Sequence, residues 1–175
     1  PARLCELVRM YALDVGFAFD GDADRCIAVD ERGEVVDGDG ILFVCAKDMR
    51  ERGEDAGGGV VTTVDSNGAL ARALERMGIR CVRTQVGDKF VSEEMARRGA
   101  LLGGEPSGHI VFRKYATTGD GILTAIRLSE VVLERKCPLS FLTRGYVPLP
   151  QRRRNVPVRG GADIVSSERV RAAIA

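Results

Sequence analysis

From residue 38 onward, short β-branched segments alternate with amphipathic segments at helical spacing, and this alternation restricts the fold more than any other feature of the sequence. Glycine or proline follows several of these segments, which supports the division. The expected helices and strands occupy residues 40–51, 60–64, 68–77, 80–84, 89–98 and 121–135, with an apolar segment at 100–102. Because strands that alternate with helices are typical of layered α/β proteins, the sequence predicts a three-layer α/β/α domain with a mixed, largely parallel sheet.

The residues that flank the expected helices are of the types found at helix ends. Ser66, Asp88 and Asp120 precede three of the helices, and each side chain can accept a hydrogen bond from a free amide of the first turn. Gly78 and Gly99 follow two of the helices, where glycine adopts the left-handed conformation that ends a helix. These residues predict three capped helices within the domain.

We divide the sequence into three parts. Residues 38–145 form the α/β/α domain. Residues 1–37, predicted as a helix followed by a strand hairpin, form the end of a preceding domain. Residues 146–175 contain three prolines and a basic run, and we expect them to form a linker and the start of a further domain. With partial domains on both sides, and with Pro1 in place of an initiating methionine, we expect an internal piece of a longer protein.

The charge balance argues against a nucleic-acid partner. Lys and Arg total 26 and Asp and Glu total 25, whereas non-specific nucleic-acid binding requires a clear positive excess. The three arginines at 152–154 are typical of a solvated linker. No apolar stretch approaches the roughly 20 residues of a membrane span, and no signal peptide opens the chain. Because the five cysteines are scattered without a CxxC pair, we expect a reduced, cytoplasmic protein without a membrane anchor.

Three carboxylates occur at every second position between the two expected strands of the N-terminal part. Asp20, Asp22 and Asp24 follow an apolar run, and a loop at this place can turn all three side chains toward one point. Such carboxylates repel one another unless a cation neutralises them. Mg²⁺ prefers few carboxylates completed by a phosphate oxygen, so these residues predict a Mg²⁺ site. We call residues 20–25 the metal loop.

The metal loop permits two other interpretations. Counted from Asp20, its carboxylates and Glu31 have the spacing of a calcium-binding EF-hand. However, Arg25 stands at the sixth position, where that loop requires glycine, and both flanks are predicted strands rather than helices. The sequence therefore excludes the EF-hand, and an acidic surface turn without a ligand is the remaining alternative.

Residues 103–109 combine three glycines with Glu105, Ser107 and His109, the only histidine of the chain. Glycines allow a close approach to a ligand, and the three polar side chains offer donors and acceptors that suit sugar hydroxyls. The same glycines and Pro106 are equally typical of a tight turn. A lone histidine is by default a structural hydrogen-bonding residue. Composition alone therefore leaves both interpretations of this segment open, and we call it the sugar loop.

Two polar turns at expected helix starts are further candidates. Gly87, Asp88 and Lys89 open one helix, and residues 117–121 open another. Helix N-termini attract anions, and Lys89 could pair with a phosphate group. Ordinary capping accounts for Asp88 and Asp120 equally well. We include Gly87, Asp88 and Lys89 among the candidate substrate-binding residues.

Together these motifs resemble the α-D-phosphohexomutase superfamily. The metal loop matches that family's Asp-Gly-Asp-x-Asp-Arg, and residues 104–109 match its Gly-Glu-x-Ser-Gly-His about 80 residues downstream. Residues 86–89 and 117–121 are most similar to the phosphoglucosamine mutase branch. Residues 151–158 resemble the connector to the family's last domain. The resemblance covers essentially the whole chain.

The resemblance implies four domains around a cleft and a phosphoserine in the first domain. The phosphoserine transfers its phosphoryl group to a sugar phosphate, and a bisphosphate intermediate then turns over and returns the other phosphate. By resemblance, Asp20, Asp22 and Asp24 hold Mg²⁺ together with the phosphoserine, and Arg25 contacts the transferring phosphate. Glu105 and Ser107 are then expected to hold the sugar hydroxyls.

By the same resemblance, His109 supports the sugar loop or contacts the ligand. None of the seven serines is followed by His-Asn-Pro, as the family's catalytic loop requires. The family's phosphate-clamping Arg-x-Ser-Gly-Thr-Glu is also missing. Because the nucleophilic serine is absent from the sequence, we expect the chain alone to be inactive.

The activity expected of the parent protein is the interconversion of glucosamine 6-phosphate and glucosamine 1-phosphate, an intramolecular phosphotransfer of the isomerase class. A phosphomannomutase/phosphoglucomutase is the nearest alternative, because Glu105 suits a hydroxyl as well as an ammonium group. A non-catalytic sugar-phosphate-binding module is the alternative from another class. The expected partners are a hexosamine or hexose phosphate and the missing domains of the same parent.

Overall fold

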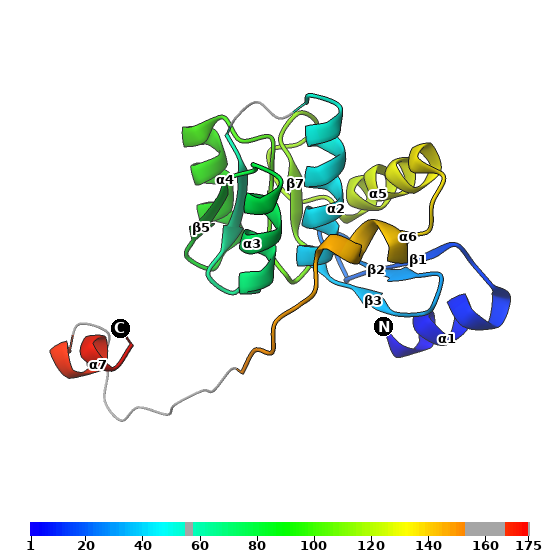
Figure 1. The fold of residues 1–175 in the computed structure, drawn as a ribbon, viewed down its shortest axis with the longest axis horizontal. Coiled ribbons are helices and arrows are strands. Elements are labelled where there is room, and N and C mark those ends of the chain that lie inside the picture. Colours follow the sequence, from blue (N-terminus) through cyan, green and yellow to red (C-terminus); the bar gives the residue numbers. More distant parts are fainter. Residues whose placement is uncertain (55–57, 153–166, 175) are drawn as a thin grey trace.

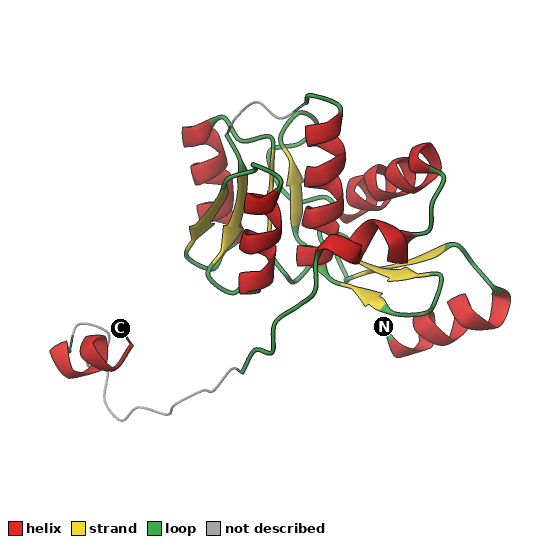
Figure 2. Cartoon of the chain, in the orientation of Figure 1, coloured by secondary structure: helices red, strands yellow, loops and turns green. Residues whose placement is uncertain are grey.

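The computed structural model describes residues 1–54, 58–152 and 167–174, and Figures 1 and 2 show how its helices and strands are arranged. Two sheets, one antiparallel and one mixed, organise the described residues. The elements in chain order are α1 (Ala2–Tyr11), β1 (Val15–Phe19), β2 (Cys26–Asp30), β3 (Val35–Val36), α2 (Gly38–Glu51), β4 (Val60–Thr63), α3 (Gly68–Arg76), β5 (Cys81–Thr84), α4 (Asp88–Arg98), β6 (Leu102–Gly104), β7 (Ile110–Phe112), α5 (Gly121–Arg135), α6 (Leu139–Leu142), the 3₁₀ helix η1 (Thr143–Gly145) and α7 (Glu168–Ile174).

The first sheet has the strand order β1-β2-β3 and is antiparallel throughout. Its register pairs Val15 with Asp30 at one end and Phe19 with Cys26 at the other. The metal loop is therefore the hairpin connection between β1 and β2. Helix α1 covers this sheet, and its buried Val8 belongs to the same apolar cluster as Val29 of β2.

The second sheet has the order β5-β4-β6-β7, in which β4 is parallel to β5 and β6, and β7 is antiparallel to β6. Successive side chains of a strand point to opposite faces. In β4, Val60 joins the core formed with α2 and α3, whereas Val61 joins the core formed with α4. Helices thus cover both faces of a mixed, largely parallel sheet, and the expected three-layer α/β/α fold is confirmed (Figure 1).

The main core continues into the antiparallel sheet. Ala28 of β2 and Val36 of β3 belong to the same buried cluster as Ile41, Leu70 and Leu128, which lie on α2, α3 and α5. This shared core fixes the hairpin that carries the metal loop against the α/β/α layers. The division of the chain at residue 37 stays a prediction.

The start of α3 differs from the expected one. Asn67, not Ser66, is the N-cap, and its side chain accepts a hydrogen bond from the Ala69 amide at 3.0 Å. The hydroxyl of Ser66 instead contacts the Thr62 hydroxyl inside the protein. Gly78, with φ +71°, follows the end of the helix in the expected left-handed conformation.

The start of α4 also corrects the sequence interpretation. Gly87 is the N-cap residue and Asp88 is already the first residue of the helix, without a side-chain capping bond. The prediction for α5 is confirmed, because Asp120 accepts a hydrogen bond from the Leu123 amide at 2.9 Å. Gly99 ends α4 in the left-handed conformation, with φ +71°.

The segment after η1 returns to the α/β/α layers. The Asn67 side chain pairs with both backbone groups of Leu149, accepting from its amide at 3.0 Å and donating to its carbonyl at 2.9 Å. Residues 153 and 154 of the basic run lie outside the described residues. Among the helices of the described part of the chain, none has the length and apolar character needed to cross a membrane.

Candidate active site

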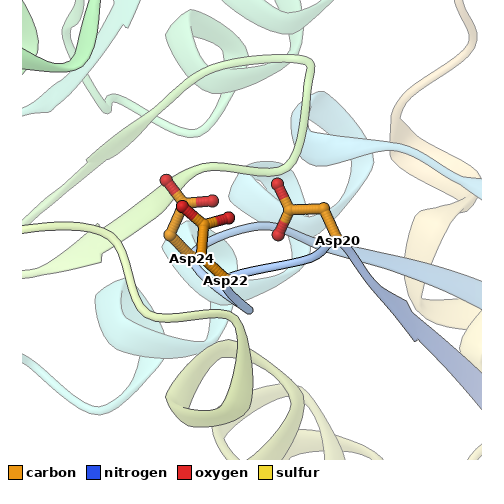
Figure 3. A group of neighbouring side chains, drawn as sticks. All are labelled: Asp20, Asp22 and Asp24. Carbon is orange, nitrogen blue, oxygen red and sulfur yellow. The ribbon is translucent and has the colours of Figure 1, made fainter.

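The metal loop brings its three carboxylates together (Figure 3). Asp20, Asp22 and Asp24 each offer an oxygen, and these oxygens all lie within 4.8 Å of one another. Ala23, between the last two, has φ +59°, in the left-handed region that non-glycine residues rarely adopt. Such a backbone persists where the surrounding structure holds it, and it is most common at functional loops.

Arg25 is the cation nearest to the three carboxylates. Its Nε lies 2.6 Å from Asp20 Oδ2 and 3.5 Å from Asp24 Oδ1, and its side chain is 51% exposed. The charge of Asp20 raises the pKa of Arg25. Burial acts to raise the pKa of Asp20, but the hydrogen bond from the Arg25 amide and the guanidinium charge outweigh it and hold that pKa below its usual value. Asp20 is therefore ionised at neutral pH.

The carboxylates retain unused acceptor capacity. Asp20 Oδ2 and Asp24 Oδ1 are buried and share the Arg25 Nε as their charged neighbour, without a well-aligned hydrogen bond, and Asp22 is exposed and forms no ion pair within the described residues. One guanidinium thus faces three carboxylates. Oxygen donors with excess negative charge suit a hard divalent cation, so the geometry fits the metal that the sequence predicts.

The sugar loop lies directly against the metal loop. Arg25 and His109 form an isolated antiparallel bridge, and the Cys26 amide donates to the Gly108 carbonyl at 3.0 Å. Gly108 has φ +95°, and a Cβ at this position would lie 2.3 Å from the Cys26 carbonyl oxygen, so only glycine fits. Two motifs that are about 80 residues apart in sequence are therefore joined by backbone contacts.

A hollow of about 180 Å³ opens beside the two loops. Asp20 and Arg25 of the metal loop and Ser107 of the sugar loop line it, together with the apolar Phe19 and Ile27. Ser107 is exposed and makes its hydroxyl available to this space. The hollow thus combines a guanidinium, a hydroxyl and the edge of the carboxylate cluster.

Glu105 is oriented by a neighbouring turn. Its Oε1 accepts a hydrogen bond from the Gly87 amide at 3.0 Å. Gly87 has φ +132°, a conformation that favours glycine. Of the other two residues predicted there, Asp88 is exposed and accepts from the Lys89 amide at 2.7 Å, and Lys89 is exposed, 3.8 Å from Glu93. The structure thus places Gly87 behind Glu105 and leaves Asp88 and Lys89 on the surface of α4.

His109 is buried between the metal loop and the start of α5. Its Nδ1 lies 3.1 Å from Asp24 Oδ2, and its Nε2 accepts from the Gly119 amide at 3.0 Å. The sequence interpretation missed the roles of Gly119 and Gly121 in this arrangement. The Gly121 amide donates to the Ala23 carbonyl at 2.9 Å, and a Cβ on Gly121 would lie 2.6 Å from the Arg25 carbonyl oxygen. The two glycines that flank Asp120 are the sequence feature from which these close backbone contacts could have been predicted.

Comparison with known proteins identifies the family. Residues 37–148 match the sequence profile described as phosphoglucomutase/phosphomannomutase, alpha/beta/alpha domain III. Among solved structures, a phosphoglucomutase/phosphomannomutase family protein from Burkholderia thailandensis superposes with a TM-score of 0.73 at 29% identity, covering 83% of this chain and 31% of that one.

Curated relatives are more similar in sequence. The phosphoglucosamine mutase of Symbiobacterium thermophilum is 51% identical over 175 residues, which are 100% of this chain and 39% of the relative. The phosphoglucosamine mutase of Desulforudis audaxviator is 50% identical over the same share of both. This chain thus spans about two fifths of the length of the relatives that it matches. It belongs to the phosphoglucomutase/phosphomannomutase family, and within that family it is most similar to phosphoglucosamine mutases.

Proposed function

We propose that this chain is the metal-binding and sugar-recognising part of a phosphoglucosamine mutase, whose complete form interconverts glucosamine 6-phosphate and glucosamine 1-phosphate. The observation that carries the proposal is the junction of the metal loop with the sugar loop through the Arg25–His109 bridge. The identity of about 50% to phosphoglucosamine mutases over the whole chain supports this substrate.

The metal loop is proposed to hold Mg²⁺ through Asp20, Asp22 and Asp24. Their excess of negative charge over the single Arg25 guanidinium among the described residues, and their clustered geometry, support this assignment. When bound, the ion offsets the negative charge that spreads over a phosphoryl group during transfer. The sequence contains no Ser-His-Asn-Pro, so the complete protein must supply the nucleophilic serine.

The residues around the hollow are proposed to contact different groups of the sugar phosphate. Arg25, half exposed beside Asp20, is placed to donate hydrogen bonds to an anionic oxygen such as that of a transferring phosphate. The hydroxyl of Ser107 can donate to or accept from a sugar hydroxyl. Glu105, with one oxygen held by the Gly87 amide, keeps further acceptor capacity for a hydroxyl or an ammonium group. Asp88 and Lys89 are proposed to act only at the periphery of the substrate site.

A phosphomannomutase/phosphoglucomutase is the second candidate, because the matched domain profile carries that name. A carboxylate at Glu105 suits either class of sugar. Assays of the complete parent with glucosamine, glucose and mannose phosphates separate the two candidates. Preference for glucosamine phosphate supports our proposal, and a higher kcat/KM for mannose or glucose phosphate contradicts it.

The site assignments are tested by steady-state kinetics of the complete parent, supplied with sugar 1-phosphate and catalytic bisphosphate. We expect Asp22→Ala to lower kcat by about a hundredfold or more with little change in KM, because transition-state charge stabilisation is lost. Glu105→Ala should lower kcat and raise KM, each about tenfold, because it removes a contact that both binds the sugar and positions it for the transition state.

Glu105→Gln is the matched control for Glu105. The amide oxygen can still accept from Gly87, so this variant separates the orientation of the side chain from its charge. A parent in which Asp22→Ala keeps near-normal kcat would refute the metal assignment. Turnover by the 175-residue chain alone would refute the need for an external nucleophile.

A further inference from the structure

His109 is enclosed on both sides of its ring. The side chain is 6% exposed, and it stands between the metal loop and the turn at 117–121. Nδ1 faces Asp24 Oδ2 at 3.1 Å, and Nε2 faces the Gly119 amide at 3.0 Å. Both ring nitrogens are therefore engaged within the protein, and neither points into the hollow lined by Ser107 and Arg25.

The two partners determine where the proton of the neutral ring resides. A backbone amide can only donate, so Nε2 must be the unprotonated acceptor for Gly119. An ionised carboxylate can only accept, so Nδ1 must carry the proton that is shared with Asp24. The neighbours on both sides thus select the same tautomer. A carboxylate that receives such a hydrogen bond is held in one orientation.

The His109 ring packs closely against the backbone of Gly119. A Cβ on Gly119 would lie 2.4 Å from Nε2 and 2.5 Å from Cδ2 and Cε1. The backbone on the other side is held by the Arg25–His109 bridge and by the bond from the Gly121 amide to the Ala23 carbonyl. The ring therefore adds a side-chain link between two segments that the Gly121–Ala23 backbone bond already joins.

We propose that His109 is a positioning residue, neutral with its proton on Nδ1, that fixes the Asp24 carboxylate in the acidic cluster and transmits the position of the turn at 117–121 to it. The inference deepens the proposed function and rests on it, since Asp24 is one of the proposed metal ligands. The inference gives His109 a different role from Glu105 and Ser107, the two residues of the sugar loop that are proposed to contact a sugar.

The first test reads the tautomer directly. Because His109 is the only histidine, ¹⁵N-histidine labelling gives one pair of ring signals in an NMR spectrum of this chain. At about pH 8, where an ordinary imidazole is neutral, we expect a protonated-type shift for Nδ1 and an unprotonated-type shift for Nε2. A proton on Nε2, or an average of the two tautomers, would overturn the proposal.

The second test measures the affinity of the chain for Mn²⁺ by water-proton relaxation, because Mn²⁺ accepts the same oxygen ligands. His109→Asn places an amide donor where Nδ1 stands, whereas His109→Gln retains an acceptor only near the Nε2 position. We expect His109→Gln to weaken Mn²⁺ binding about tenfold and His109→Asn to remain close to the wild type.

Gly119→Ala gives an independent variant in which the histidine is unchanged. Its Cβ displaces the ring, so we expect a similar loss of about tenfold in Mn²⁺ affinity. Gly68→Ala is the matched control, because a Cβ there meets its nearest neighbour at 3.7 Å and the affinity should not change. Equal affinity in all variants, or no Mn²⁺ binding by the wild type, would overturn the proposal. Neither test uses a sugar phosphate, so a failed mutase assignment leaves both results readable.

Discussion

Two clusters of three carboxylates lie in different parts of this protein, and they differ in how their charges are balanced. In the metal loop, Arg25 is the one guanidinium that the described part of the chain places beside the three aspartates. In the second group, which we call the α2–α5 cluster, Arg52 and Arg135 together contact all three carboxylates. Its carboxylates belong to Asp48, Glu51 and Glu134.

The centre of the α2–α5 cluster is Asp48, whose side chain is 2% exposed. Arg52 Nε lies 2.7 Å from one of its oxygens, and Arg135 donates to the other through Nε at 2.9 Å and Nη2 at 2.7 Å. Both arginines have raised pKa values, Arg135 mainly through its hydrogen bonds to Asp48. Two arginines thus face three carboxylates, and the ion pairs between Arg135 and Asp48 fasten α5 to α2.

The comparison teaches that the number of acidic residues does not identify a cation site, whereas incomplete compensation does. The metal loop holds its three carboxylates close together at the edge of a hollow, and within the described residues one guanidinium faces them where the α2–α5 cluster has two. An excess of negative charge of this kind favours a bound cation, as we propose for the metal loop. In the α2–α5 cluster, Arg52 and Arg135 supply the compensating positive charges.

The largest effect is expected in the α2–α5 cluster. Asp48→Ala should lower the free energy of unfolding by about 2 kcal/mol, less than for a fully buried pair because both arginines can regain contact with water. Glu51→Ala, on the same helix but 45% exposed, should lower it by about 0.5 kcal/mol. Urea unfolding of both variants measures the difference. A loss below about 1 kcal/mol for Asp48→Ala would remove the structural distinction between the clusters.

The next effect concerns the metal loop with its ion. This chain offers three carboxylates and no phosphoserine, and Mg²⁺ dehydrates reluctantly, so we expect Mg²⁺ to bind at about millimolar concentration or weaker. Asp22→Asn should weaken that binding about tenfold, or about 1.4 kcal/mol, because one ligand charge is lost. Titration followed by NMR of the loop amides measures both. Micromolar Mg²⁺ affinity would contradict our account of the incomplete site.

In the metal-free chain, the same substitution should increase stability rather than weaken an interaction. Asp22→Asn removes one of three mutually repelling charges, so the metal-free chain should gain up to about 0.5 kcal/mol of stability. Thermal unfolding in the presence of a chelator measures the gain. Asp48→Asn provides the contrasting case, since its loss of charge leaves two arginines without their shared partner. Destabilisation of the metal-free chain by Asp22→Asn would mean that the metal loop is already balanced.

Local sequence signals predicted much of the fold, because glycine, helix caps and apolar periodicity act within a few residues. The stops at Gly78 and Gly99 and the cap at Asp120 are of this kind. The cap at Ser66 was wrong because its hydroxyl contacts Thr62 inside the protein, which leaves capping to the next residue. Asp88 failed for a different reason, since Gly87 provides the N-cap backbone conformation in its place.

The candidate site was predictable only where its residues are neighbours in sequence. Asp20, Asp22 and Asp24 lie on one hairpin connection, so their spacing alone suggests convergence. The contact of His109 with Asp24 joins residues 85 positions apart and depends on how two sheets are placed against each other. The role of Gly119 depends on the same tertiary contact, because only the packed ring makes its missing side chain necessary.

The smallest expected effect comes from a third carboxylate, which is fully compensated yet lies on the surface. Glu94 accepts hydrogen bonds from Arg97 at 2.6 and 2.8 Å and also from Arg98, and these bonds lower its pKa from 4.5 to about 2. Because the folded-state pKa is the lower one, the stabilisation is complete above about pH 4.5 and disappears as the pH falls toward 2. Solvent reaches this partly exposed group and its partner Arg97, which is 65% exposed, and screens the interaction, so Glu94→Gln should lower the melting temperature at pH 7 far less than Asp48→Ala. The difference from the wild type should also shrink steadily between pH 4.5 and pH 2. Thermal unfolding across that range measures it, and an effect at pH 7 as large as that of Asp48→Ala would show that compensation, rather than burial, decides what these clusters contribute.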